Sequence, residues 1–325
     1  MRGLARKYLF FSIWVAGVIA VNATGQRSDL PPLWAYPMAA SDYKVPVDDG
    51  KLRHVPGSPA TWTLSQLRDR FFAPDWHPEE HPSMPEVVAH GRKPGVYACG
   101  FCHRAEGTGG PENANIAGLP KAYIIQQMAA FRSGARKTSV PERPSFKYMS
   151  ATAKAATDNE IAQAAAYFSS IKPRKLITVV EAQEVPKSYV AAAVYARLPG
   201  NEKEPIASRI LEMPKDLEQF ESRDTHSEFI AYVPPGSLAI GKALATTGAA
   251  GKTTPCTQCH GAVLRGLGPV PGIAGRSPSY LMRQLHDMKQ GVRSGPGSQL
   301  MTPVLANLSD ADLTSLVAFA ASLDP

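Results

Sequence analysis

The sequence of 325 residues has only four cysteines, little charge of either sign and no long apolar run after its first 25 residues. A membrane-spanning helix needs about 20 consecutive apolar residues, so we expect no span in the rest of the chain. The formal net charge of +7 includes three basic residues near the N-terminus, and the remainder is too scattered to indicate nucleic-acid binding. Apolar residues make up 44% of the chain, which excludes wholesale disorder.

The first 25 residues have the composition of a secretory signal peptide. Basic Arg2, Arg6 and Lys7 precede an apolar run at residues 8–21, and the small residues after this run suit cleavage. The alternative is an uncleaved N-terminal anchor. We predict that residues 1–25 are a signal peptide, so that the mature chain is periplasmic and has no membrane span.

All four cysteines belong to two copies of one pattern, Cys99-Gly100-Phe101-Cys102-His103 and Cys256-Thr257-Gln258-Cys259-His260. Cys-x-x-Cys-His is the attachment signal of c-type haem, in which both thiols bind the porphyrin and the histidine ligates iron. A redox dithiol would need a βαβ context, which is lacking, and a zinc site would need the two pairs brought together. The pattern predicts two covalently bound haems c, no disulfide and no free thiol.

The two motifs belong to a duplicated module, which spans residues 84–173 in the first copy and 236–325 in the second. An offset of 157 residues aligns the motifs and several residues after them. The aligned pairs include Tyr123 and Tyr280, Gln127 and Gln284, Gly134 and Gly291, and Arg136 and Arg293. A helix in this region keeps an apolar stripe at i, i+4 and i+7 in both copies.

After this helix the offset falls to 152 residues, so the first copy carries a five-residue insertion near residues 138–145. In the new register residues 157–160 align with residues 309–312, and both segments predict a capping box that starts a final helix. Met149 aligns with Met301, and we expect both to lie outside any helix, shortly before the final one.

The recurring methionines are candidates for the second axial ligand of each iron. Met–His ligation raises the reduction potential, and a filled sixth position discourages reaction with peroxide or oxygen. The alternative role of a methionine is ordinary core packing. We predict that His103 and Met149 ligate the first iron and that His260 and Met301 ligate the second.

Two regions lie outside the repeat. Residues 26–83 are rich in proline and aromatic residues, and we expect an extension that packs over the first module, with one short helix near residues 63–72. Residues 174–235 connect the modules and contain three β-branched or aromatic segments, at residues 176–180, 209–211 and 229–233. The predicted fold class is therefore all-α, with two tandem domains, a linker that holds a small antiparallel β element, and a Pro-rich N-terminal extension.

Some other signals are weaker. His77-Pro78-Glu79-Glu80-His81 matches a zinc-peptidase pattern, but its prolines prevent the continuous helix which that chemistry needs. The unpaired histidines, which we expect to be structural or on the surface, are His54, His90, His226 and His286. We expect the basic residues near the motifs to be mostly solvated, with contacts to haem propionates or an acidic partner as alternatives. They include Arg132, Arg136, Lys137, Arg276 and Arg293.

Both modules resemble class I cytochromes c, and their order resembles the bacterial two-haem cytochromes of the c-four type. The segments that carry the resemblance are the two Cys-x-x-Cys-His motifs, Ile116-Ala117-Gly118 and Ile273-Ala274-Gly275, the aligned helix, Met149 and Met301-Thr302-Pro303. The resemblance implies two small helical domains and an electron-transfer role outside the inner membrane. The chain departs from that family in its long linker and extension, and in Met149-Ser150-Ala151, which lacks the proline found in the second copy.

These observations predict a periplasmic electron carrier, not an enzyme. Its expected partners are redox proteins: a dehydrogenase as donor, and a terminal oxidase or another cytochrome as acceptor. One alternative is a cytochrome subunit of an exported dehydrogenase, with residues 26–83 and 174–235 forming the subunit contact. A two-haem peroxidase is the other, but it would need one haem with an open sixth position, and the paired methionines argue against that.

Overall fold

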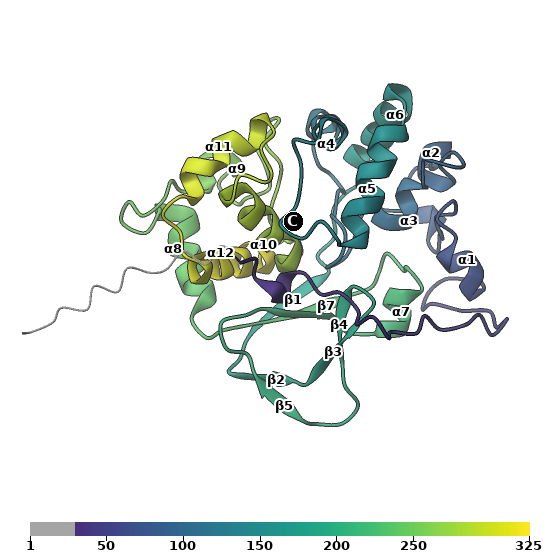
Figure 1. Cartoon of the computed structure of the whole chain (residues 1–325), viewed down its shortest axis with the longest axis horizontal. Coiled ribbons are helices and arrows are strands. Elements are labelled where there is room, and N and C mark those ends of the chain that lie inside the picture. Colours follow the sequence, from purple (N-terminus) through teal and green to yellow (C-terminus); the bar gives the residue numbers. More distant parts are fainter. Residues whose placement is uncertain (1–29) are drawn as a thin grey trace, which may run out of the picture.

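A computed structural model describes residues 30–325, in which two helical domains lie side by side and a small β region lies beneath them (Figure 1). The predicted signal peptide, residues 1–25, lies outside the described residues. The helices of the first domain are α2 (Glu86–Ala89), α3 (Cys99–His103), α4 (Lys121–Ser133), α5 (Pro144–Ala155) and α6 (Asp158–Ser170). Those of the second domain are α8 (Ser237–Thr247), α9 (Thr257–His260), α10 (Pro278–Lys289), α11 (Pro296–Leu305) and α12 (Asp310–Ser322).

The last helix of each domain begins at the predicted capping box. The backbone N–H of Glu160 donates to Thr157 Oγ1 at 3.2 Å, and Glu160 Oε2 accepts from the backbone N–H of Thr157 at 2.7 Å. Ser309 and Asp312 form the same reciprocal pair at the start of α12. These bonds satisfy N–H groups that the first helical turn leaves without partners.

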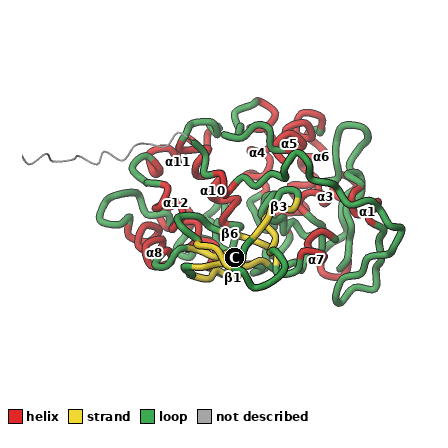
Figure 2. The backbone as a smooth tube through the Cα atoms, turned by 60° about the horizontal axis from the view of Figure 1, so that its bottom comes forward, coloured by secondary structure: helices red, strands yellow, loops and turns green. Residues whose placement is uncertain are grey.

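The connection between the domains forms a three-stranded sheet with the order β1-β7-β6. Figure 2 shows its strands gathered between the two helical domains. The bounds are β1 (Ile177–Glu181), β6 (Leu211–Pro214) and β7 (Phe229–Val233), and two antiparallel pairs lie beside it: β2 (Glu184–Pro186) with β5 (Lys203–Pro205), and β3 (Ser188–Ala191) with β4 (Val194–Arg197).

The sheet corrects two predictions. The fold is not all-α, because β7 alternates buried and half-buried residues and contributes Phe229, Ala231 and Val233 to the core of the second domain. The β element is also not wholly antiparallel. Strand β7 pairs antiparallel with β6 but parallel with β1, since the long chain between β1 and β7 allows a crossover, which a hairpin connection would not.

The N-terminal extension packs on both domains, whereas we predicted contact with the first alone. Its helix α1 (Leu64–Arg68) is shorter than expected, and shortly after it Arg70 donates to Tyr148 Oη of α5 in the first domain, at 2.8 Å. Trp76 donates from Nε1 to the carbonyl of Ser222 in the connection, at 2.8 Å. At the other end, the 3₁₀ turn η1 (Leu33–Ala35) lies against α10, and Arg283 donates to the carbonyl of Ala35 at 2.6 Å. The extension therefore ties the two domains together.

No single helix among residues 30–325 is long and apolar enough to cross a membrane. Helices α11 and α12 reach the required length and composition only as a pair, and they meet at a bend of 118°.

Candidate functional site

Both Cys-x-x-Cys-His motifs form one short helical turn that fixes the orientation of the histidine. His103 Nδ1 bonds the carbonyl of Ala114 at 2.8 Å, and His260 Nδ1 bonds the carbonyl of Pro271 at 2.8 Å. A carbonyl can only accept, so Nδ1 carries the proton and Nε2 keeps its lone pair. Burial lowers the pKa of both imidazoles, which favours the neutral form that binds metals.

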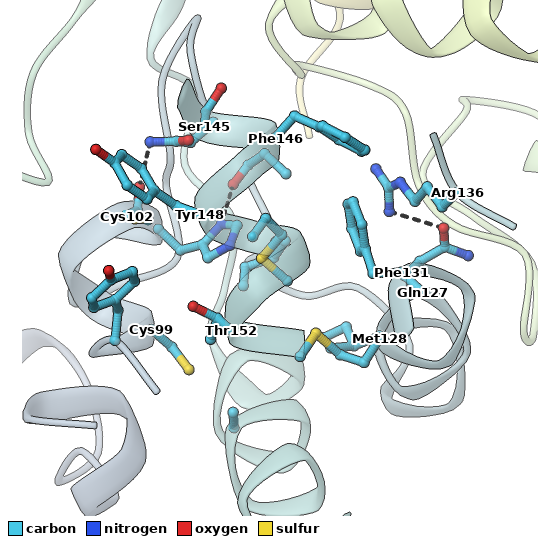
Figure 3. A pocket seen from close by; sticks show the side chains of 18 of the residues that line it. Cys99, Cys102, Gln127, Met128, Phe131, Arg136, Ser145, Phe146, Tyr148 and Thr152 are labelled. Atoms are coloured by element: carbon cyan, nitrogen blue, oxygen red, sulfur yellow. Dashed lines mark hydrogen bonds between the residues drawn. The ribbon is translucent and has the colours of Figure 1, made fainter. Parts of the chain in front are cut away.

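The structure brings the first set of predicted ligands to one cavity. Cys99, Cys102, His103 and Met149 all line it, and the space between its walls, including the open mouth, is about 1470 Å³. In Figure 3 the two cysteines lie on one side, and Met128, Gln127 and Phe131 of α4 lie on the other. The cavity wall is mostly apolar, which suits the flat apolar ring of a porphyrin.

The two methionines lie inside helices, so that part of the prediction is wrong. Met149 belongs to α5 and Met301 to α11. The chain becomes helical because Pro144 and Pro296 occupy the first helical position, where a missing N–H costs nothing and the fixed φ suits a helix. Both side chains are half-buried, and Met149 faces the cavity.

Two of the second set of predicted ligands contact the core of the second domain, and Cys259 is exposed. Cys256 is the N-cap of α9, whose last residue is His260. Cys256 and Met301 both pack against the main hydrophobic cluster of that domain.

Three of the four cysteines, Cys99, Cys102 and Cys256, have the environment of inert thiols, whereas Cys259 is exposed. None of the four is in a disulfide. Burial raises the pKa of the Cys99 thiol to about 12 and that of Cys256 to about 11. A redox dithiol needs the opposite shift, because the thiolate is the nucleophile. This finding weighs against the dithiol alternative.

A symmetric network joins the domains beside the cavity, and its members are repeat-related: Arg136 and Arg293, Gln127 and Gln284, Tyr123 and Tyr280. Arg136 of the first domain donates to Tyr280 Oη and Gln284 Oε1 of the second, at 2.8 and 2.9 Å. Arg293 of the second donates to Tyr123 Oη and Gln127 Oε1 of the first, at 3.1 and 2.9 Å. The two arginines also pair through their backbones in an antiparallel bridge.

The expectation that the basic residues near the motifs are mostly solvated is wrong for three of them. Arg136, Arg276 and Arg293 are less than one-tenth exposed, because each reaches across to the other domain. Arg276 donates to the carbonyls of Asn115 and Ala117, both at 2.9 Å, and burial lowers its pKa to about 10. Its contacts therefore hold the second domain to the first.

The histidine pattern at residues 77–81 forms no continuous helix, since η2 covers only Pro78–Glu80. His77 Nε2 lies 3.0 Å from Asp224 Oδ1, and its ring stacks on that of His226 with centroids 3.8 Å apart and planes 7° apart. Ligand atoms of these three residues lie within 4.8 Å of one another. Two parallel stacked rings have their nitrogen lone pairs in separate planes, so one ion cannot bind both imidazoles well. The cluster instead links the extension to the connection.

The residues present fit a haem c. Two thiols three positions apart lie beside an imidazole whose Nε2 is free, and the cavity has a methionine sulfur among its lining atoms. In the same cavity wall, Arg143 has two buried N–H-bearing atoms without a partner among the described residues. The thiols suit the vinyl groups of a haem, and the imidazole and the thioether suit its iron. The unpaired guanidinium suits its carboxylates.

Sequence reasoning identified the cysteines and histidines but missed most of the cavity wall. Met128 packs against the core of the first domain and also lines the cavity with Phe131. Gln127 and Gln284 were found only as aligned positions. The glutamine repeated at the same position of both aligned helices was the available signal that these positions meet at an interface.

One family model and three relatives are informative. The cytochrome c family model matches residues 89–172. A cytochrome c-554(548) of Halomonas halodenitrificans is 37% identical over 72 residues, which cover 22% of this chain and 87% of that protein. A thiosulfate dehydrogenase electron acceptor of Thiomonas intermedia (strain K12) is 26% identical over 70% of this chain and 80% of its own length. A cytochrome c4 of Azotobacter vinelandii is 25% identical over 68% of this chain and 82% of its own length.

Proposed function

The chain belongs to the cytochrome c family, and on that premise we propose that it is a periplasmic electron carrier with two His–Met-ligated haems. Membership confirms haem c with iron as the cofactor and electron transfer as the general role. The single observation that carries the finer proposal is the cavity in which Cys99, Cys102, His103 and Met149 meet.

Each residue has a definite task in this proposal. Cys99 and Cys102 hold the first haem, and Cys256 and Cys259 hold the second. His103 and His260 present Nε2 to the iron, because their Nδ1–H groups are held by backbone carbonyls. Met149 and Met301 would each supply a thioether sulfur as the second protein ligand of an iron. When bound, each haem supplies an iron that takes up and releases one electron.

The protein matrix keeps that exchange free of side reactions. The cavity wall is mostly apolar, and its lining residues include Val96, Ile116, Leu119, Ile124 and Ile161. Apolar surroundings limit solvent access and favour the less charged reduced state. A methionine at the sixth position leaves no site for peroxide, so the carrier is not an enzyme in this proposal.

A relative supports an exported dehydrogenase as the electron donor. The Thiomonas intermedia protein, which matches over most of both chains, is named for accepting electrons from thiosulfate dehydrogenase. We propose a dehydrogenase of this kind as donor, and a terminal oxidase or another cytochrome as acceptor.

A second candidate function is a cytochrome subunit that stays bound to such a dehydrogenase. It is favoured by the extension, which contacts both carrier domains through hydrogen bonds such as Arg70 to Tyr148 and Arg283 to Ala35. Co-purification from native periplasm separates the two functions, since a free carrier elutes at the mass of one chain or its oligomer.

A potentiometric titration of the purified holoprotein, followed by visible absorption, tests the carrier. We expect two reversible one-electron components of similar amplitude, because each chain holds two haems. Peroxide added to the reduced protein should cause no sustained turnover. A high-spin haem that turns over peroxide would contradict the proposal and support the peroxidase alternative.

A further inference from the structure

Arg143 is a buried cation whose hydrogen-bonding capacity is mostly unused. Its side chain is only 4% exposed. Nη1 donates to the carbonyl of Glu112 at 3.3 Å, whereas Nε and Nη2 are buried and have no partner among the described residues. Leaving one buried donor unsatisfied costs about 1–3 kcal/mol, and more for a charged group, so the fold has a strong reason to offer Arg143 an anion.

The unpaired atoms belong to the wall of the first haem cavity. Arg143 lines that cavity together with Cys99, Cys102 and Met149. The other arginines of the wall already have partners: Arg136 in the interdomain network, and Arg283 at the carbonyls of Ala35 and Pro111. Among the arginines of the described cavity wall, Arg143 is thus the one whose buried N–H groups lack hydrogen-bond partners.

The surroundings of Arg143 intensify its need for an anion. Burial, followed by repulsion from Arg283, lowers the pKa of the guanidinium to about 9, and the Glu112 carboxylate opposes this only in part. No hydrogen bond or ion pair joins the side chains of Arg143 and Glu112 in the described part of the chain. A second carboxylate, supplied from inside the cavity, would restore the balance of charge.

We infer that Arg143 binds a propionate carboxylate of the haem held by Cys99 and Cys102, and that it raises the reduction potential of this haem above that of the second. The inference rests on the proposed attachment of a haem at these cysteines. A cation beside the porphyrin disfavours the oxidised iron, which carries one more positive charge than the reduced iron.

The second haem has no equivalent of this arginine. Arg143 directly follows the five-residue insertion of the first copy, and the repeat offset of 152 that holds after the insertion aligns it with Gly295. Arg143 is the N-cap of α5, and Gly295 is the N-cap of α11. Glycine has no side chain, so this position distinguishes two haems whose other proposed ligands are the same.

The test is a potentiometric titration of holoprotein carrying Arg143→Gln, with Lys137→Gln as control. Lys137 also lines the cavity but is exposed to solvent. We expect Arg143→Gln to lower one midpoint potential so that the reduced-to-oxidised ratio of that haem changes about tenfold, or ~59 mV for one electron. The other potential should stay in place, Arg143→Lys should restore most of the shift, and Lys137→Gln should have little effect.

Several outcomes would overturn the inference while leaving the carrier intact. One such outcome is that both haems are attached and that Arg143→Gln changes neither reduction potential. Dependence of the wild-type potential on added inorganic phosphate would also do so, because Arg143 would then bind a free anion. If the Gln variant does not fold, a crystal structure of the wild-type holoprotein decides, since Arg143 must lie within hydrogen-bonding distance of a propionate. Absence of haem at Cys99 and Cys102 would instead refute the proposed function.

Discussion

Single side chains decide what each iron can do, and the methionines are the clearest case. Met149 and Met128 both line the first cavity, from α5 and α4 respectively. The repeat pairs Met149 with Met301, whereas Met128 aligns with Leu285. Met149 is therefore a proposed iron ligand, whereas Met128 is a residue of the cavity wall. Substitutions of these two methionines make a matched test and control.

We expect Met149→Ala to abolish the methionine–iron charge-transfer absorption of one haem, and Met301→Ala to abolish that of the other, because each removes a proposed axial ligand. The near-infrared spectrum of the oxidised protein measures this. Met128→Ala is the control, and it should leave both bands in place. A band that survives its own methionine substitution would show that another group ligates that iron.

The sequence allowed a prediction for the cysteines and histidines because those residues lie within one helical turn. It could not predict Arg143, Arg276 or Arg283, whose partners lie far away in the chain. Arg276, for example, binds carbonyls at Asn115 and Ala117 that only the packing of the two domains brings close. Long side chains of this kind show no local pattern that separates a buried role from a solvated one.

Among the elements, the final helix of each domain begins at a capping box that the sequence predicted correctly. The first turn of α6 also carries an ion pair that the sequence did not reveal. Arg92 donates to both carboxylate oxygens of Glu160, at 2.8 and 3.2 Å. The Arg92 guanidinium and the Thr157 cap together lower the pKa of Glu160 to about 2.

Glu160→Gln should reduce the free energy of unfolding by about 1 kcal/mol at neutral pH, allowing for the exposure of Arg92. The contribution of Glu160 is fully present above its unfolded pKa of about 4.3 and is lost as the pH falls through its folded pKa of about 2. Urea denaturation at pH 7, 4 and 2.5 measures the difference, which should shrink towards low pH.

Asp158→Asn is the control for this experiment, because Asp158 lies on the same helical turn and pairs with Arg132 while 91% exposed. It should change stability by less than about 0.5 kcal/mol. An equal loss in both variants, or a loss from Glu160→Gln that does not depend on pH, would contradict the role given to Arg92 and the cap.

The elements that the sequence misjudged are those governed by tertiary packing. Helices α5 and α11 replace the irregular segments expected around the methionines, since the Pro-initiated turns continue where each helix packs on its neighbour, α4 or α10. Strand β7 gains a parallel partner, β1, that comes from the far end of the connection. Neither outcome can be deduced from local propensity.

For the whole molecule, the repeat produces a pseudo-symmetric joint. Arg136 and Arg293 cross between the domains in the same way, and the extension closes the joint by packing Tyr36 against the second domain, where its Oη donates to Asp287 at 3.1 Å. These contacts imply that the domains unfold together.

Arg293→Gln should destabilise the protein by about 2 kcal/mol, because it removes charge-assisted bonds and leaves Tyr123 and Gln127 less well satisfied. Arg136→Gln should have a similar effect, and the double variant should cost less than the sum, since both arginines share Gln127 and Gln284. Calorimetry of the holoprotein measures this. Arg132→Gln is the control at an exposed site. Strict additivity would contradict a shared network.

We propose that this chain carries two covalently bound haems, each ligated by a histidine and a methionine. Haem quantification on purified full-length protein, together with its oxidised near-infrared spectrum, tests this proposal. We expect two haems per chain and methionine–iron absorption of the strength that two sites give. One haem per chain, or a high-spin spectrum at either site, would contradict it.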